Sequence, residues 1–170
     1  MIDKIEARIK TDMKSKITHQ LKKSKGFGSL EIIQRLPKKS RRRCDTLKLQ
    51  LEAIRATMDK DSIEMQEEFA LLLLTDAKEL IAGVSLYRGT ADEILTDPAD
   101  IIRLAVLARA YYVIVAHNHP NGHPQPSNAD LDHASRMAHA LRFCNLELLD
   151  SIIITRKKHF SLYENGLIWT

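Results

Sequence analysis

With 170 residues, of which 44% are apolar, the chain is long enough for one domain with a real core and an appendage, but not for two full domains. Its net charge of +4 is unevenly distributed, because residues 1–60 hold 17 Lys and Arg against 7 Asp and Glu, while residues 61–170 hold 9 against 15. The longest apolar runs, 69–74 and 110–116, are far shorter than the ~20 residues that cross a bilayer, so a membrane protein is excluded and a soluble cytoplasmic protein is expected.

Residues 1–44 are predicted to form a basic, helical N-terminal arm. Apolar residues recur at near-helical spacing over residues 1–25, and 30–36 is predicted as a second short helix. A basic run follows, made of Lys38, Lys39, Arg41, Arg42 and Arg43. These side chains could bind the phosphates of a nucleic acid. A solvated charge run or a protein-docking segment fits the sequence equally well, because no aromatic residues are interleaved with the charges.

Residues 45–170 are predicted to form one domain in which strands and helices alternate. Two apolar segments, 69–75 and 79–86, flank a turn and predict a β-hairpin. Segment 111–116 is apolar on both faces, as in a central strand, and segments 151–155 and 159–163 close the sheet. Helices are expected after three capping residues, Asp45, Asp97 and Ser127. This order predicts an α/β fold with a sheet between helices.

Segment 117–130 carries the residues with the clearest chemical role. His117 and His119 stand at positions i and i+2 where the predicted central strand ends, so their imidazoles face the same side. Asp130 follows in the first turn of the next helix. These three residues are predicted to bind Zn²⁺ and to leave its fourth tetrahedral position to water, as in catalytic zinc sites. Such a water becomes a nucleophile near neutral pH.

The motif His-x-His, followed after seven residues by Ser-x-x-Asp, resembles the JAMM signature of the MPN/JAB metalloproteases. The intervening string, Pro-x-Gly-x-Pro-x-Pro-Ser over 120–127, is similar to the RadC branch of that group, and the resemblance extends over residues 67–170. It implies a cytidine-deaminase-like JAB/MPN sandwich, with a mixed sheet flanked by helices. It also implies a zinc cofactor and the hydrolysis of peptide or isopeptide bonds in a protein or peptide substrate. The historical RadC name itself implies DNA repair.

The resemblance implies two further catalytic residues. A glutamate just before the first core strand would accept a proton from the zinc-bound water. By position this residue is Glu68, with Glu67 as the alternative, because a shift of one residue in register exchanges the two faces of a strand. Ser127 would donate a hydrogen bond to the developing oxyanion. From the residues alone, Ser127-x-x-Asp130 is also a capping-box pattern, and the two roles can coexist.

Two classes of function follow from these observations. The first is a zinc-dependent hydrolase of amide bonds. The second is a DNA-repair-associated accessory protein in which the motif is structural and the basic arm binds nucleic acid. A zinc deaminase is disfavoured, because His-x-Glu and Pro-Cys-x-x-Cys are absent from the sequence. His123 could reach the metal or line the substrate cleft, but solvation in the loop is expected. His133, three residues after Asp130 on the same helical face, could support the metal ligands, but a partly exposed histidine is expected. Cys144 is expected to lie in the core.

Overall fold

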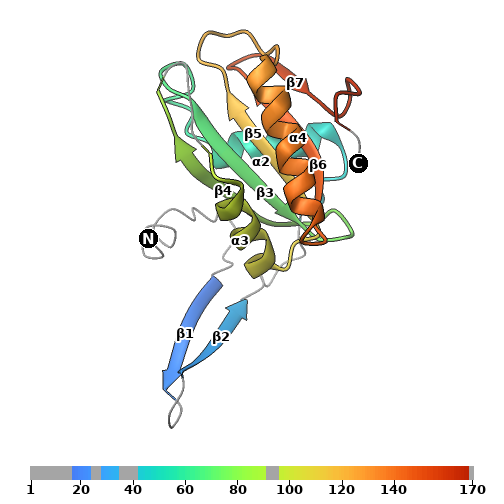
Figure 1. Ribbon diagram of the computed structural model, residues 1–170. Helices are drawn as coiled ribbons and strands as arrows, with labels where there is room; N and C mark the ends of the chain where they lie inside the picture. Colours follow the sequence, from blue (N-terminus) through green and yellow to red (C-terminus); the bar gives the residue numbers. More distant parts are fainter. Residues whose placement is uncertain (1–16, 24–27, 35–41, 91–95, 169–170) are drawn as a thin grey trace.

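The computed structural model describes residues 17–23, 28–34, 42–90 and 96–168. Its main feature is a five-stranded sheet in the order β4-β3-β5-β6-β7 (Figure 1). Its strands are β3 (Glu68–Leu74), β4 (Leu80–Arg88), β5 (Tyr112–Asn118), β6 (Glu147–Ile154) and β7 (His159–Ser161). β5 and β6 run parallel, and every other neighbouring pair is antiparallel. The sheet is therefore mixed, with β5 at its centre as predicted.

Helices cover both faces of this sheet (Figure 1). α2 (Leu47–Thr57) packs on one face, and α3 (Pro98–Ala108) and α4 (Asn128–Arg142) pack on the other. Successive side chains of β3 point to opposite faces of the sheet. Because helices cover both faces, all seven residues are buried, and the segment is apolar from Phe69 onward. The predicted α/β sandwich is confirmed. Among the described residues, none of the helices combines the length and apolarity that crossing a membrane requires.

Capping residues determine where the helices begin. Asp97 caps α3 and Ser127 caps α4, as predicted. α2 differs from the prediction, because Thr46 is its N-cap residue. The carboxylate of Asp45 instead pairs with Arg43, at 2.8 Å.

Several elements end at different residues from those predicted. β5 continues two residues further, through His117 and Asn118, and β6 begins four residues earlier, at Glu147. Parallel pairing of β5 with β6 extends the sheet over polar residues that an apolar pattern does not mark as strand. Cys144 was expected in the core, but it is exposed because α4 ends at Arg142 and its buried stripe ends with it.

The helical arm predicted for residues 1–44 is corrected over the part that the structure describes. β1 (Ile17–Lys23) and β2 (Gly28–Gln34) pair as an antiparallel two-stranded sheet. Apolar residues four apart, such as Ile17 and Leu21, share a face in a strand as well as in a helix, so their spacing did not distinguish the two. The β-branched residues in both segments favour the strand. Residues 1–16 and 35–41 lie outside the described residues, and their helical prediction stays a prediction.

One carboxyl group, that of Asp150, is buried in the sheet, and the hydrogen bonds that it accepts come from uncharged donors. Asp150 in β6 is 3% exposed and accepts hydrogen bonds from the Ser161 hydroxyl (2.6 Å) and the Tyr163 N–H (3.0 Å). Burial raises the pKa of Asp150 from 3.8 to about 6. A carboxyl group with a raised pKa in the folded state stabilises the protein below pH ~4, and this contribution is lost as the pH rises through ~6.

The variant Asp150→Asn keeps the size of the side chain but cannot ionise. We therefore expect its free energy of unfolding, relative to that of the wild type, to rise from about pH 4 to about pH 7, by at most about 3 kcal/mol. Denaturant titrations followed by circular dichroism at each pH measure this difference. Asp132→Asn, at an exposed carboxylate, is the control. A difference that stays constant with pH would contradict the expectation.

Candidate metal centre

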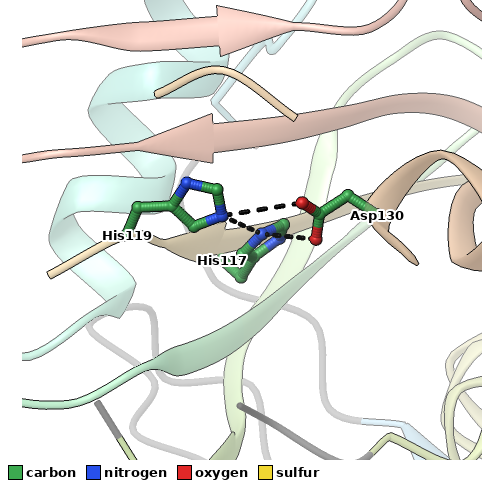
Figure 2. A group of neighbouring side chains, drawn as sticks. All are labelled: His117, His119 and Asp130. Atoms are coloured by element: carbon green, nitrogen blue, oxygen red, sulfur yellow. Dashed lines mark hydrogen bonds and ion pairs between the residues drawn. The ribbon is translucent and has the colours of Figure 1, made fainter. Parts of the chain in front are cut away.

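Two histidines and one aspartate meet where β5 ends. His117 is buried and is the second-last residue of the strand, His119 follows the strand, and Asp130 lies in the first turn of α4. One potential ligand atom from each residue lies within 4.8 Å of the others. Both imidazoles point toward the carboxylate of Asp130 (Figure 2). The structure thus brings together the three residues that the sequence predicted as metal ligands.

The alternation of side chains along β5 places both imidazoles on one face. His117 pairs with Phe69 of β3, which packs with α3 and α4, so the His117 side chain faces α4. His119 lies two residues further along and faces the same way. Its main-chain N–H donates to the carbonyl oxygen of Ile154 at 3.0 Å, which continues the pairing with β6 beyond the end of β5.

The loop after the strand orients the His119 ring. The Gly122 N–H donates to the His119 carbonyl oxygen at 3.1 Å, and Gly122 has a φ of 79°, which glycine adopts without steric cost. The carbonyl oxygen of His123 then lies 2.8 Å from Nδ1 of His119. Because a carbonyl oxygen only accepts, this contact assigns the hydrogen of a neutral ring to Nδ1 and leaves the Nε2 lone pair free. A histidine that binds a metal through Nε2 has this tautomer.

Asp130 is fixed by the residue that caps its helix. Ser127 Oγ accepts the Asp130 N–H at 3.2 Å, and Oδ2 of Asp130 accepts the N–H (2.7 Å) and the hydroxyl (2.6 Å) of Ser127. This capping box confirms the predicted cap. Since the hydroxyl hydrogen of Ser127 is donated to Asp130, an oxyanion could receive it only after this bond is released. The oxyanion role of Ser127 stays a prediction.

The pKa values of Asp130 and His119 are both shifted. Burial alone would raise the pKa of Asp130, but hydrogen bonds from His117, His119 and Ser127 hold that pKa well below its usual range. The hydrogen bond to Asp130 raises the pKa of His119, against the opposing effect of burial. Asp130 is therefore an anion at any physiological pH, and it attracts a positive charge, whether a proton on His119 or a cation, to this point.

The donor atoms have the spacing that a tetrahedral metal ion requires. Nε2 of His117 lies 3.0 Å from Nε2 of His119 and 3.0 Å from Oδ1 of Asp130, and Nε2 of His119 lies 3.7 Å from Oδ2 of Asp130. Bonds of 2.0–2.1 Å at tetrahedral angles separate ligand atoms by about 3.3 Å. The three residues therefore fit a metal ion with little movement of their side chains.

Glu68, the predicted catalytic base, does not lie with these residues. Its carboxylate is on the α2 face of the sheet, where it accepts the N–H of Asp59 at 2.8 Å and the hydroxyl of Ser85, and it lies 3.8 Å from Arg88. The Glu68 side chain is 2% exposed and is fully engaged there. The placement of Glu68 in the site is corrected, because its position in the strand directs it to the opposite face.

Glu67, the alternative base, lies on the face that carries the metal ligands. It is buried, it stands two residues before Phe69, and continuing the register of β3 with β5 sets it opposite His119. Its N–H donates to the Thr90 carbonyl oxygen at 2.8 Å, and its carbonyl oxygen accepts the Gly89 N–H at 2.9 Å. The charge of Glu67 contributes to the raised pKa of His119.

Two other histidines differ in their relation to the site. His123 is exposed, as expected, and contributes its carbonyl oxygen only. His133 is half-buried, with Nε2 2.6 Å from Thr96 Oγ1 and its ring edge-on to Phe69 at 5.7 Å. Burial lowers the pKa of His133, so its ring is neutral near pH 7. The expectation of a partly exposed His133 agrees with this half-buried position.

The basic run before α2 is only partly described. Lys38, Lys39 and Arg41 lie outside the described residues. Arg42 pairs with Glu52, and Arg43 pairs with Asp45 at 2.8 Å. The two described arginines therefore already have acidic partners within the chain.

Residues 46–167, well over half of the chain, match the model of a known family, the RadC-like JAB domain. The chain belongs to the RadC-like JAB domain family. This membership confirms the resemblance based on segment 117–130, and the fold described above is that of a JAB/MPN domain.

Curated relatives of this RadC-like protein match about the same part of the chain. UPF0758 protein YeeS of Escherichia coli (strain K12) is 36% identical over 103 residues, which cover 61% of this chain and 70% of YeeS. A UPF0758 protein of Xanthomonas campestris pv. campestris (strain 8004) is 38% identical over 102 residues, covering 60% of this chain and 45% of that protein. A UPF0758 protein of Shewanella loihica is 37% identical, with the same coverage. The similarity thus spans less than half the length of the last two relatives.

Removal of one imidazole should strongly weaken metal binding without unfolding the domain. In His119→Ala we expect the affinity for zinc to fall by roughly 100-fold or more, because a ligand contributes at least as much as the groups that orient it. The secondary structure should be retained, since His119 lies outside both core clusters. Competition with a chromophoric chelator and circular dichroism measure the two properties. His123→Ala, which keeps the carbonyl oxygen, is the matched control; wild-type affinity in His119→Ala would exclude His119 as a ligand.

Metal binding should weaken as the pH falls. A proton on His119 competes with the metal, and the pKa of His119 is raised above 6.5 by Asp130, so competition begins at a higher pH than for a free histidine. Asp130 adds no competition, because its pKa is lowered. Below the raised pKa we expect about a tenfold loss of apparent zinc affinity per pH unit for each proton displaced. Chelator competition between about pH 6 and 8 tests this, and an affinity independent of pH would contradict it.

Proposed function

We propose that this RadC-like protein is a zinc-dependent hydrolase that cleaves amide bonds, peptide or isopeptide, in a protein or peptide substrate. One observation supports this proposal best. Three side chains with the spacing of metal ligands converge at the end of β5, and the register of β3 assigns the buried residue Glu67 to the same face of the sheet. A site that only binds a structural metal closes around it with protein ligands and has no use for an additional acid–base group.

We propose zinc because the family resemblance implies it and the donor set is compatible with it. Two imidazole nitrogens and one carboxylate oxygen are typical ligands of zinc in hydrolases, and a set of three leaves a coordination position for the reaction. Ions such as Ca²⁺ and Mg²⁺ prefer sites made of oxygen ligands alone. No thiol takes part, because neither cysteine belongs to the group of candidate ligands among the described residues.

The residues of the chain can divide the chemistry of amide hydrolysis among them. A bound zinc ion supplies a Lewis acid for the substrate carbonyl and lowers the pKa of water. Glu67 accepts a proton from the attacking water and delivers it to the nitrogen of the leaving amine. His117, His119 and Asp130 hold their positions through the strand end, the loop and the helix cap described above. The chemistry thus uses one acid–base residue on a rigid support.

Ser127 acts first through Asp130 in this proposal. Its N–H and hydroxyl fix the carboxylate, which sets the direction of one ligand. The donation of its hydroxyl to an oxyanion, as the family resemblance implies, is an additional proposal that requires rotation of that hydroxyl away from Asp130.

Among the described residues, nothing supports nucleic-acid binding through the basic run. Arg42 and Arg43 are paired with acidic side chains, and the other three basic residues lie outside the description. An association with DNA repair therefore stays a prediction from the sequence. The amide-hydrolase proposal has the stronger support, from the arrangement of the metal centre.

The proposal is tested by exchanging each glutamate in turn. The zinc-loaded protein is incubated with a proteome-derived peptide library, new N-termini are identified by mass spectrometry, and the best-cleaved peptide is used for kinetics. We expect Glu67→Gln to retain zinc and to lose roughly 100-fold or more in kcat, because glutamine cannot accept the proton. Cleavage of no peptide by the zinc-loaded wild type, in the library or in an isopeptide-linked peptide pair, would overturn the hydrolase proposal.

Glu68→Gln is the matched control for this experiment. Its carboxylate lies on the α2 face and takes no part in the proposed chemistry, so kcat should stay within about threefold of the wild-type value. Its thermal stability should fall, because hydrogen bonds from Asp59 and Ser85 to a charged acceptor are weakened. An inactive Glu68→Gln together with an active Glu67→Gln would return the role of base to Glu68.

A further inference from the structure

Asn118, the residue between the two candidate histidine ligands, is fully buried on the opposite face of the sheet. Its Oδ1 accepts the Glu68 N–H at 2.7 Å. Its Nδ2 donates to the carbonyl oxygens of Ile63 (2.8 Å) and Gln66 (2.9 Å). All three partners are main-chain groups of segment 63–68, which leads into β3. A single amide therefore fastens this segment to the strand that carries the metal ligands.

These hydrogen bonds enclose Glu67 from both sides along the chain. The Asn118 amide binds the residue before it, Gln66, and the residue after it, Glu68. The main chain of Glu67 is itself hydrogen-bonded to segment 89–90. The backbone of Glu67 is thus held between the end of β5 and the residues that follow β4. The distance from its carboxylate to His117 and His119 depends on these contacts.

We propose that Asn118 is a positioning residue, which sets the location of the Glu67 carboxylate relative to the metal ligands through segment 63–68. The inference rests on the proposed function, in which Glu67 is the acid–base residue. Strand geometry makes the arrangement possible, because consecutive side chains of β5 point to opposite faces. The end of β5 thereby supplies the candidate ligands on the α4 face. On the α2 face it supplies Asn118, which hydrogen-bonds to the segment that contains Glu67. Proton transfer is sensitive to such placement, since an error of ~1 Å can cost about 100-fold in rate.

The simpler explanation is that Asn118 only satisfies buried main-chain groups and so contributes to stability. Two variants separate the explanations. Asn118→Ala removes all three hydrogen bonds, and Asn118→Asp keeps the size and the acceptor for Glu68 but cannot donate to Ile63 or Gln66. The matched control is Gln50→Ala in α2, which removes another buried amide, with its hydrogen bond to the Cys44 carbonyl oxygen at 3.1 Å. Circular dichroism selects a temperature at which every variant is folded.

The decisive measurement is a double-mutant cycle with Glu67→Gln, using the peptide selected for the wild type. We expect Asn118→Ala, or Asn118→Asp if the alanine variant does not fold, to lower kcat by roughly 10- to 100-fold while zinc affinity stays within about threefold. In the Glu67→Gln background the same substitution should cost less than about threefold, because the group that it positions is already inactive. Gln50→Ala should leave kcat near the wild-type value in both backgrounds.

A second measurement does not depend on a substrate. In zinc-loaded Asn118→Ala, which loses the acceptor of the Glu68 N–H, NMR should show the amide of Glu68 exchanging with solvent at least about tenfold faster, while that of Leu72 in the middle of β3 is unchanged. Unchanged exchange at Glu68, unchanged kcat, or a loss of kcat that persists in the Glu67→Gln background would each overturn the positioning role. A parallel loss of zinc affinity would also overturn it, since Asn118 would then act on the ligands. Failure of the proposed function has a different signature, namely wild-type activity in Glu67→Gln or no cleavage at all.

Discussion

The carboxylate of Asp130 is the group on which the arrangement of the site depends. It accepts hydrogen bonds from the N–H and the hydroxyl of Ser127, the N-cap residue of α4, and it faces Nε2 of both His117 and His119. One side chain therefore connects the start of a helix to the end of a strand. Those two elements belong to different layers of the fold. The negative charge that makes Asp130 favourable in the first turn of α4 also makes it a good ligand for a cation. Structural and chemical roles therefore coincide in the same atoms.

Burial of so many polar groups near one strand end requires that each finds a partner. His117, Asn118, Glu67 and Glu68 are all buried there. The two faces of the sheet handle them differently, with the candidate ligands toward α4 and the main-chain fastening toward α2. Among the described residues, no buried side-chain nitrogen or oxygen lacks a hydrogen-bond partner. Such a saturated network is rigid, and rigidity suits a site whose ligands must keep their separation.

Local patterns predicted most of the domain, because they are determined by nearby residues. Asp97-Pro98 and Ser127 define helix starts through their own side chains, and the spacing of His117, His119 and Asp130 is explained by one strand end and one helix turn. The faces of the sheet on which Glu67 and Glu68 lie could not be derived in this way, because they depend on the register of β3 against β5. That register is given by the pairing of Phe69 with His117, 48 positions away. The strands β1 and β2 were missed for a related reason, since their apolar spacing fits both helix and strand until a pairing partner is known.

The contact between the His119 ring and the carbonyl oxygen of His123 has a consequence for how this loop can change over time. The contact uses only the peptide group, which every amino acid provides, so substitution at position 123 leaves it intact. The shape of the loop depends instead on its neighbours, the positive φ of Gly122 and the buried ring of Pro124. Sequence drift should therefore be free at 123 and restricted at 122 and 124. Position 123 can thus orient the His119 ring through its main chain, whatever side chain it has.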